Sequence, residues 1–525
     1  MIRLFDREPW SLESLTPPWG NLPCIYLQIR KGVLEPLPDD GIVFKNSKFK
    51  WGGGAMDGVL ATHTRSAAQK QRVSEVSSAL RRLERRADST GLLKLYELVV
   101  ENTVVNYIDA ILEQLTDGIS PHDGQRFLTI GRYLATKAGH REAVKFGLAL
   151  MGAFGSNEES EIFMTLGRSD EFTLFAAVAL ARVARHPDHA LWDLAKSVNG
   201  WGRIQVVRLL RDTQDSAIQE WLLREGFRNN VMDEYLACIC ARAGRLHEAL
   251  NRQNVDLALL TAAAEIIRAL ITEGPAEGID DYEYSADACE SYVNIVWSRN
   301  DLGLEHFLAV AQLRSFLSEP GDWEKRHQSG WTDLRRQTIQ SLADDVVTRD
   351  IWRHKVMEAL SDNDDLVFHR GDEAAQRLSI DTWDLHFSRV KASPLTSSSW
   401  YRLMRQTDEI RLDEVLTFAE SVLPLDQIET GPADELGLGP NFRPHQALGW
   451  VLQDLRRFPN RGWRLIKAGL HSPVVSNRNM AISALSAWNI ESLGADIRSV
   501  LVKARDAEPK DEVRGRLERL IAVHP

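Results

Sequence analysis

The chain has 525 residues, of which 44% are hydrophobic and 26% charged, so it can bury a large core without disulfides or metals. Its formal net charge of −11 disfavours nucleic acid and anionic membranes as partners. The four cysteines form no regular framework of the kind found in secreted disulfide proteins, which favours reduced thiols and a cytoplasmic protein.

The first residues, "MIRLFDREPWSLESL", carry early acids and no apolar core, so we expect no signal peptide. The longest apolar stretch, residues 257–271, is interrupted by charges and too short to span a bilayer. We therefore expect no membrane association.

Residues 1–64 differ in pattern from the rest of the chain. "NLPCIYLQIR" (21–30) alternates and is rich in β-forming residues, and "DDGIVFKNSKFKW" (39–51) holds another short strand candidate. Two or three strands are marginally stable alone. We therefore expect a small N-terminal β-rich module over residues 1–64 that leans on a helical body.

The stretch "KWGGGAMDGVLATHTR" (50–65) is the best candidate for chemistry. A phosphate-binding loop needs Lys and then Ser or Thr after its last glycine, but Val and Leu follow Gly58. A dinucleotide fingerprint needs a glycine where Asp57 stands. The glycines favour a tight turn with positive φ between a strand and the first helix. The alternatives are a catalytic site or a ligand-binding loop with Asp57 and His63 as its polar groups.

From residue 66 onward the pattern is almost entirely helical. The helix expected over 66–87 has one apolar face. Its other face is basic between Lys70 and Arg86, which predicts either a solvated surface or a surface for phosphate or an acidic partner.

Helix pairs repeat between residues 141 and 274. First helices are expected to begin at Arg141, Glu171, Gly202 and Met232, so the period is about 30 residues. Shorter second helices lie between them, and Asp188 and Asp215 are expected to be N-caps of two of these.

This pairing of amphipathic helices resembles HEAT-type or armadillo-type α-solenoids. Near the C-terminus, "HSPVVSNRNMAISALSAW" (471–488) is similar to the first helix of a HEAT repeat. The residues that carry the likeness are Pro473, Arg478, Ala481, Leu485 and Trp488. The resemblance covers residues 141–274 and roughly 445–525. It implies a mainly α fold of stacked helix pairs whose concave face binds a protein or peptide.

Two irregular stretches suggest how the helical body is divided. The acidic, Gly-rich segment 272–285 is the best candidate break, which gives helical-repeat segments over 65–275 and 286–525. The second segment contains a long loop at 423–445 with no period of its own.

The other candidate motifs for metal binding are either incomplete or better explained by local structure. "HEALN" (247–251) lacks the second histidine of a zinc helix, and "HPDH" (186–189) is better explained as a turn with a helix cap. "DNDDLVFHRGDE" (362–373) lacks the ligand order of a calcium loop. With no nucleophile motif either, the sequence favours a protein that is not an enzyme, with no catalytic residue, no metal and no cofactor.

The leading hypothesis is therefore an interaction or scaffold protein that binds a protein or peptide partner through a curved helical-repeat surface. We expect Trp201, Arg203, Arg208 and Arg211 on that surface. The alternative is a ligand-binding or enzymatic module that uses the Gly-rich segment 51–65. A third is a HEAT-like protein that grips the DNA backbone, which the acidic net charge disfavours. No particular oligomeric state is predicted.

Overall fold

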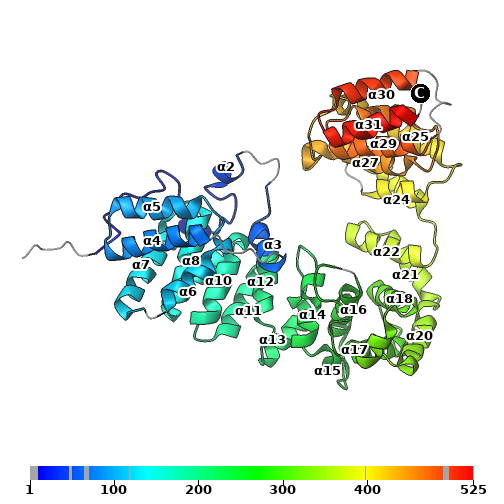
Figure 1. Ribbon diagram of the computed structural model, residues 1–525. Helices are drawn as coiled ribbons and strands as arrows, with labels where there is room; N and C mark the ends of the chain where they lie inside the picture. The colour runs from blue at the N-terminus through cyan, green and yellow to red at the C-terminus, as the bar shows by residue number, and fades with distance from the viewer. Residues whose placement is uncertain are drawn as a thin grey trace, which may run out of the picture. The chain divides into compact units, whose positions relative to one another are not determined.

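The computed structural model describes residues 10–45, 50–63, 70–117, 119–272, 274–395, 398–488 and 496–523 (Figure 1). The elements in these ranges are helices, and the pairing of Glu435 with Val474 is their single β-bridge. The chain is therefore mainly helical, as predicted. No helix in the described ranges is long and apolar enough to cross a membrane.

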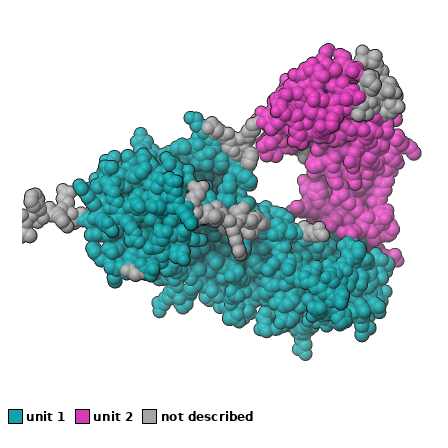
Figure 2. Space-filling model, in the orientation of Figure 1, with its two compact units in different colours: residues 1–349 teal, residues 350–525 magenta. Residues whose placement is uncertain are grey.

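The chain forms two compact units, Met1–Arg349 and Asp350–Pro525 (Figure 2). The acidic stretch 272–285 lies inside the first unit. There the N–H of Ile279 donates to the carbonyl of Leu270, and both side chains are buried.

The predicted N-terminal β module is not present in the described part of residues 10–63, where three short helices stand instead. They are α1 (Ile25–Arg30), α2 (Asp40–Val43) and α3 (Ala55–His63). The alternation in the first predicted strand was misleading because Ile25 and Ile29, four residues apart, are both buried. That spacing places them on one helix face, which packs against α7 (Pro121–Lys137).

The remaining helices of the first unit run from residue 70 to residue 347. They are α4 (Lys70–Arg85), α5 (Ser89–Val100), η1 (Val104–Asn106), α6 (Ile108–Thr116), α7, α8 (Arg141–Phe154), η2 (Asn157–Glu159), α9 (Ser160–Gly167), α10 (Asp170–Val183), α11 (Pro187–Ser197), α12 (Trp201–Leu209), α13 (Ser216–Trp221), the π-helical turn η3 (Leu222–Gly226), α14 (Glu234–Ala243), α15 (Leu246–Leu250), α16 (Leu257–Ile271), α17 (Ser285–Ser298), α18 (Leu304–Ser318), α19 (Trp323–Gln328) and α20 (Asp333–Val347).

Helices α8, α10, α12, α14, α16 and α18 form a row in which each packs against the next (Figure 1). The intervening helices α9, α11 and α13 also pack in order, which gives a second row beside the first. The first four helices of the first row begin at residues 141, 170, 201 and 234, close to the predicted starts. This packing is compatible with a helical repeat.

The two predicted N-caps have different outcomes. The Asp215 carboxylate accepts the N–H groups of Ala217 and Ile218 and so caps α13, as predicted. Asp188 instead lies in the first turn of α11, where its carboxylate accepts the hydroxyl of Thr213 at 2.7 Å. The prediction of a cap at Asp188 is therefore wrong.

The helices of the second unit are α21 (Ile351–Leu360), α22 (Asp365–Arg377), α23 (Trp383–Ala392), α24 (Ser399–Gln406), α25 (Leu412–Val422), α26 (Leu425–Ile428), η4 (Pro440–Phe442), α27 (Arg443–Leu455), α28 (Trp463–Leu470), α29 (Val475–Ser486), α30 (Asp496–Ala507) and α31 (Asp511–Val523). In this unit, the α-helices from α23 to α31 share one hydrophobic core of buried side chains. The expected long loop at 423–445 contains α26 and η4, and Glu435 exchanges backbone hydrogen bonds with Pro473 and Val475.

Arg478, one of the residues that carry the HEAT likeness, is fully buried on α29. Its guanidinium makes two parallel hydrogen bonds of 2.6 and 2.8 Å to the buried carboxylate of Glu508. It also donates to the carbonyls of Ser472 and Pro473 at 2.9 Å. Arg478 thus ties the turn before α29 to the residue that follows α30.

We expect Arg478→Met to lower the free energy of unfolding of the second unit by about 3–5 kcal/mol, because Glu508 would keep a buried, unpaired charge. Hydrogen exchange of the α29 and α31 amides in the full chain measures this loss. The matched control is Arg505→Met, which removes an exposed pair with Asp506 and should change stability by about 0–1 kcal/mol. Equal effects of the two substitutions would contradict the prediction.

Candidate functional site

The glycine stretch crosses the N-terminal ends of α10 and α12. The positive φ that the sequence predicts occurs at Gly54, where φ is +68°. A Cβ at Gly54 would lie 2.2 Å from the carbonyl oxygen of Asp170, and one at Gly58 would lie 2.4 Å from the indole of Trp201. The Gly54 N–H donates to Glu171 Oε2 at 3.1 Å. The glycines therefore allow α3 to approach two other helices closely, and no strand precedes them among the described residues.

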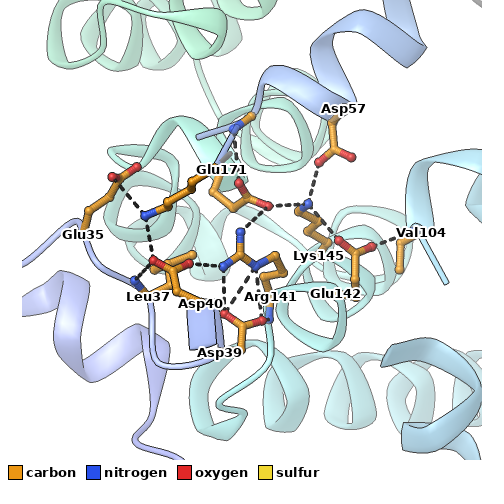
Figure 3. Close-up of polar contacts among 12 residues, drawn as sticks. Glu35, Leu37, Asp39, Asp40, Asp57, Val104, Arg141, Glu142, Lys145 and Glu171 are labelled. Atoms are coloured by element: carbon orange, nitrogen blue, oxygen red, sulfur yellow. Dashed lines mark hydrogen bonds and ion pairs between the residues drawn. The ribbon is translucent and has the colours of Figure 1, made fainter. Parts of the chain in front are cut away.

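Lys145 is the centre of a buried group of ion pairs beneath α3 (Figure 3). Its Nζ lies 2.6 Å from Asp57 Oδ2, 2.7 Å from Glu171 Oε1 and 2.9 Å from Glu142 Oε1. The Lys145 and Asp57 side chains are only 3% and 2% exposed. Glu142 Oε2 also accepts the N–H of Val104 at 2.6 Å. One ammonium group thus joins α3, α8 and α10, and Glu142 adds η1.

The protonation states of this group follow from burial and from the neighbouring charges. Burial raises the pKa of Asp57 to about 6, opposed by Lys145 and aided by the carboxylates of Glu142 and Glu171. Burial alone would lower the pKa of Lys145, but the three carboxylates outweigh it and raise that pKa. Burial would raise the pKa of Glu171, but Lys145 and Arg141 lower it. Asp57 is therefore the member whose charge changes near pH 6.

A second group of ion pairs fastens α2 to the start of α8 (Figure 3). Arg141 Nη2 lies 3.0 Å from Asp39 Oδ1, and the Arg141 backbone N–H donates to Asp39 Oδ2 at 2.8 Å. Asp40 pairs with the same guanidinium and with Lys50, whose Nζ lies 2.6 Å from Asp40 Oδ2. These carboxylates hold the second predicted strand as a helical turn against α8.

Both groups of ion pairs hold helices of the N-terminal segment against the first row. Asp57, the candidate ligand-binding residue, is buried against an ammonium, whereas a general acid or base must reach a substrate proton. His63 is the last residue of α3, and its side chain lies outside the described residues. Its convergence with Asp57 stays a prediction. No group of three His, Cys, Asp or Glu in the described part of the chain could hold a metal ion.

The predicted partner-binding residues lie on α12 or just after it, but they face different directions. Trp201 is half-buried, and its ring centroid lies 5.1 Å from that of Tyr235 on α14. The guanidinium of Arg203 lies 5.2 Å from the ring of Trp221 and donates to the carbonyl of Glu225. Arg203 therefore packs between the two rows of helices, where burial lowers its pKa.

Arg208 and Arg211 come together on the wall of a cavity of about 460 Å³ between α12, α14 and the turn after α16. Tyr235, Arg242 and Glu277 also line it. Arg242 is held by Glu277 at 3.1 Å and by a second carboxylate at 3.0 Å, so it forms a fixed wall. The side chain of Arg211 is 69% exposed.

A second cavity, of about 190 Å³, lies between α6, α8 and α10 and was not predicted. Its lining is apolar except for Asp109 on α6 and Arg182 on α10. The apolar lining residues are Val105, Ile108, Leu112, Ala149, Gly152, Ala153, Leu174, Phe175, Val178 and Ala179. The available signal was the run of small residues in "LALMGAFG", which by pattern alone is indistinguishable from close helix packing.

The ion pairs and both cavities lie along one face of the first row. On α10, Glu171, Val178 and Arg182 are one or two turns apart, which places them on the same side of the helix. On α12, Trp201 lies against α3, and Arg208 follows two turns later. Segment α3 thus covers the N-terminal ends of α10 and α12 on this face, and the cavities lie beyond it toward the C-terminal ends of these two helices. We call the residues that line the two cavities the cavity face.

Comparisons with known proteins show no family for this chain. No model of a protein family matches the sequence, and none of the curated proteins matches it. One solved structure, an engineered protein, aligns with 17% identity over 85% of this chain and 98% of its own, with a TM-score of 0.24. A TM-score this low carries no argument about fold or function.

We expect Gly54→Ala to lower the free energy of unfolding by more than about 1 kcal/mol, because a left-handed conformation and a clash with the Asp170 carbonyl would oppose the new Cβ. The matched control is Gly52→Ala, since a Cβ at Gly52 meets no atom within 4 Å. Denaturant unfolding of both variants measures the difference. A Gly54→Ala protein as stable as Gly52→Ala would contradict the close approach of α3.

We expect the natural protein to lose on the order of 3 kcal/mol of stability, relative to Asp57→Asn, as the pH rises from 4 to 7. The pKa of Asp57 is about 6 when folded and 3.8 ordinarily. The folded state therefore binds this proton more tightly, and stability falls as pH rises through this window. Denaturant unfolding at pH 4, 5, 6 and 7 measures the difference.

The control for this sign is Asp256→Asn. Asp256 pairs with Arg224 at 2.7 Å, which lowers its pKa below the ordinary 3.8. Its contribution should therefore stay nearly constant from pH 7 to pH 5 and begin to fall only as the pH drops toward 4 and below. A difference for Asp57→Asn that grows with pH, as for Asp256→Asn, would mean that Lys145 outweighs burial at Asp57.

Proposed function

We propose that this chain is an α-solenoid of the HEAT or armadillo type that binds a protein or peptide partner on its cavity face. The proposal of a solenoid is supported by the starts of α8, α10, α12 and α14, about 30 residues apart, and by their packing in sequence order. In such arrays neighbouring helix pairs bury a common core and present long surfaces to partners.

The observation that carries the interaction role is the pair of cavities on one face of the first row. The smaller is apolar, and the larger is bordered by Arg208 and Arg211, two of the residues predicted to contact a partner. Concave, mostly apolar sites with a few placed polar groups are the usual form of binding sites. We therefore assign the partner to this face rather than to Arg203, which packs between the rows.

The other two functions have less support. A ligand-binding or enzymatic module at 51–65 needs accessible polar groups, whereas Asp57 is buried against Lys145. A DNA-binding surface needs a continuous run of cations. On the cavity face the carboxylates of Asp109, Asp212 and Glu277 interrupt the arginines.

The test is affinity purification from the native host with the natural chain and with Val178→Glu. Val178 is 53% exposed and lines the smaller cavity, so a carboxylate there should abolish capture of the partner without disturbing the core. The expected result is loss of the co-purifying protein from Val178→Glu alone.

The matched control is Leu334→Glu, an apolar-to-acid change at a side chain of the same unit that is 76% exposed and lines neither cavity. Circular dichroism of both variants verifies folding. A partner that Val178→Glu captures as well as the natural chain does would overturn the assignment of the cavity face.

A further inference from the structure

The smaller cavity has the size and chemistry of a socket for one apolar side chain. A cavity of about 150 Å³ lined by apolar side chains is enough to hold benzene, and this one measures about 190 Å³. Ala149 and Ala153 form part of its wall and are half-buried, so the socket opens toward solvent. A phenyl or branched aliphatic group entering it would cover Val178 as well.

Charged groups at the edges of the cavity give its two sides opposite charges. Asp109 lies on its α6 side, and Arg182 on its α10 side. Arg182 belongs to the last turn of α10, and α10 packs against α12, whose last turn holds Arg208. Arg182 and Arg208 therefore lie on the α12 side of the socket, in the direction of the larger cavity.

Arg211 is an accessible cation beside the larger cavity. Its Nε lies 3.5 Å from Oδ2 of Asp212, the next residue, and the Asp212 side chain is 92% exposed. Such an exposed pair is weak, so an incoming carboxylate can replace it and accept a bidentate pair of hydrogen bonds from the guanidinium.

We propose that the cavity face binds an acidic peptide segment that places one large apolar side chain in the α6–α8–α10 socket and carboxylates toward Arg182 and Arg211. This rests on the proposed function and names the chemistry of the partner. The carboxylates lie on the α12 side of the anchor because Asp109 repels them on the other side.

The experiment is a selection of random 12-residue peptides displayed on phage against the full chain, followed by fluorescence polarisation of synthetic copies. The expected peptides share a Phe, Leu, Ile or Met with Asp or Glu close to it. Arg182→Glu with Arg211→Glu should weaken their binding about tenfold or more, since two attractions become repulsions. Ala153→Phe should also weaken it, because the new ring fills the socket.

Arg86→Glu is the matched control, since Arg86 is 84% exposed and lies away from both cavities, and it should leave binding unchanged. Thermal unfolding of each variant checks that it is folded. Selected peptides with no acidic bias, or no selected peptide that loses affinity in the double variant, would overturn the inference.

These outcomes separate the inference from the proposed function. Peptides blocked by Ala153→Phe but indifferent to the double variant leave the cavity face as the binding surface and reject the acidic partner. If Ala153→Phe also has no effect and Val178→Glu still captures the native partner, both fail.

Discussion

A buried ammonium group must be paired, and the pairing of Lys145 determines how the N-terminal segment meets the first row of helices. Its partners are Asp57, Glu142 and Glu171, which belong to α3, α8 and α10. Loss of the ammonium would leave three carboxylates together in a site from which water is largely excluded, which is strongly unfavourable. The position of α3 follows, because Asp57 can reach Lys145 only if the glycines let α3 lie against α10 and α12.

The distribution of charge along the first row agrees with the helix dipoles. Glu142 and Glu171 lie in the first turns of α8 and α10, where the N-terminal end of a helix favours anions. Arg182 and Arg208 lie in the last turns of α10 and α12, where the C-terminal end favours cations. These four charges therefore lie at the helix ends that favour them, and Arg182 borders the apolar socket.

The sequence predicts the helical rows well because their signal is local. Apolar spacing and turn residues locate the starts of α8 and α10 to within a residue. It fails in the N-terminal segment, where α1 and α2 are six and four residues long. Helices this short are set by tertiary contacts, such as the packing of Ile25 and Ile29 and the pairs of Asp39 and Asp40 with Arg141.

The candidate site also has a part that the sequence predicts and a part that it does not. Asp57 is notable in the sequence because it occupies the place of a glycine, but its role depends on Lys145, 88 positions later, which no local pattern connects to it. The proximity of Arg208 and Arg211 is local and could be predicted. The apolar socket could not, because it depends on how far apart α6, α8 and α10 lie.

The ion pairs help to set the distance between the two helices, α8 and α10, that form walls of the socket. Lys145 and Glu171 join α8 to α10 near their N-terminal ends. Toward the other end, Gly152 lies so close to α10 that a Cβ there would stand 2.8 Å from that of Ala179. The socket borders the contact of Gly152 with Ala179, and its lining residues Ala149 and Leu174 lie one turn after Lys145 and Glu171. The two contacts together therefore fix the separation of its α8 and α10 walls before anything enters it. A preformed socket loses little conformational entropy on binding. The buried cluster that holds Asp57 thus lies one or two turns from the proposed binding socket.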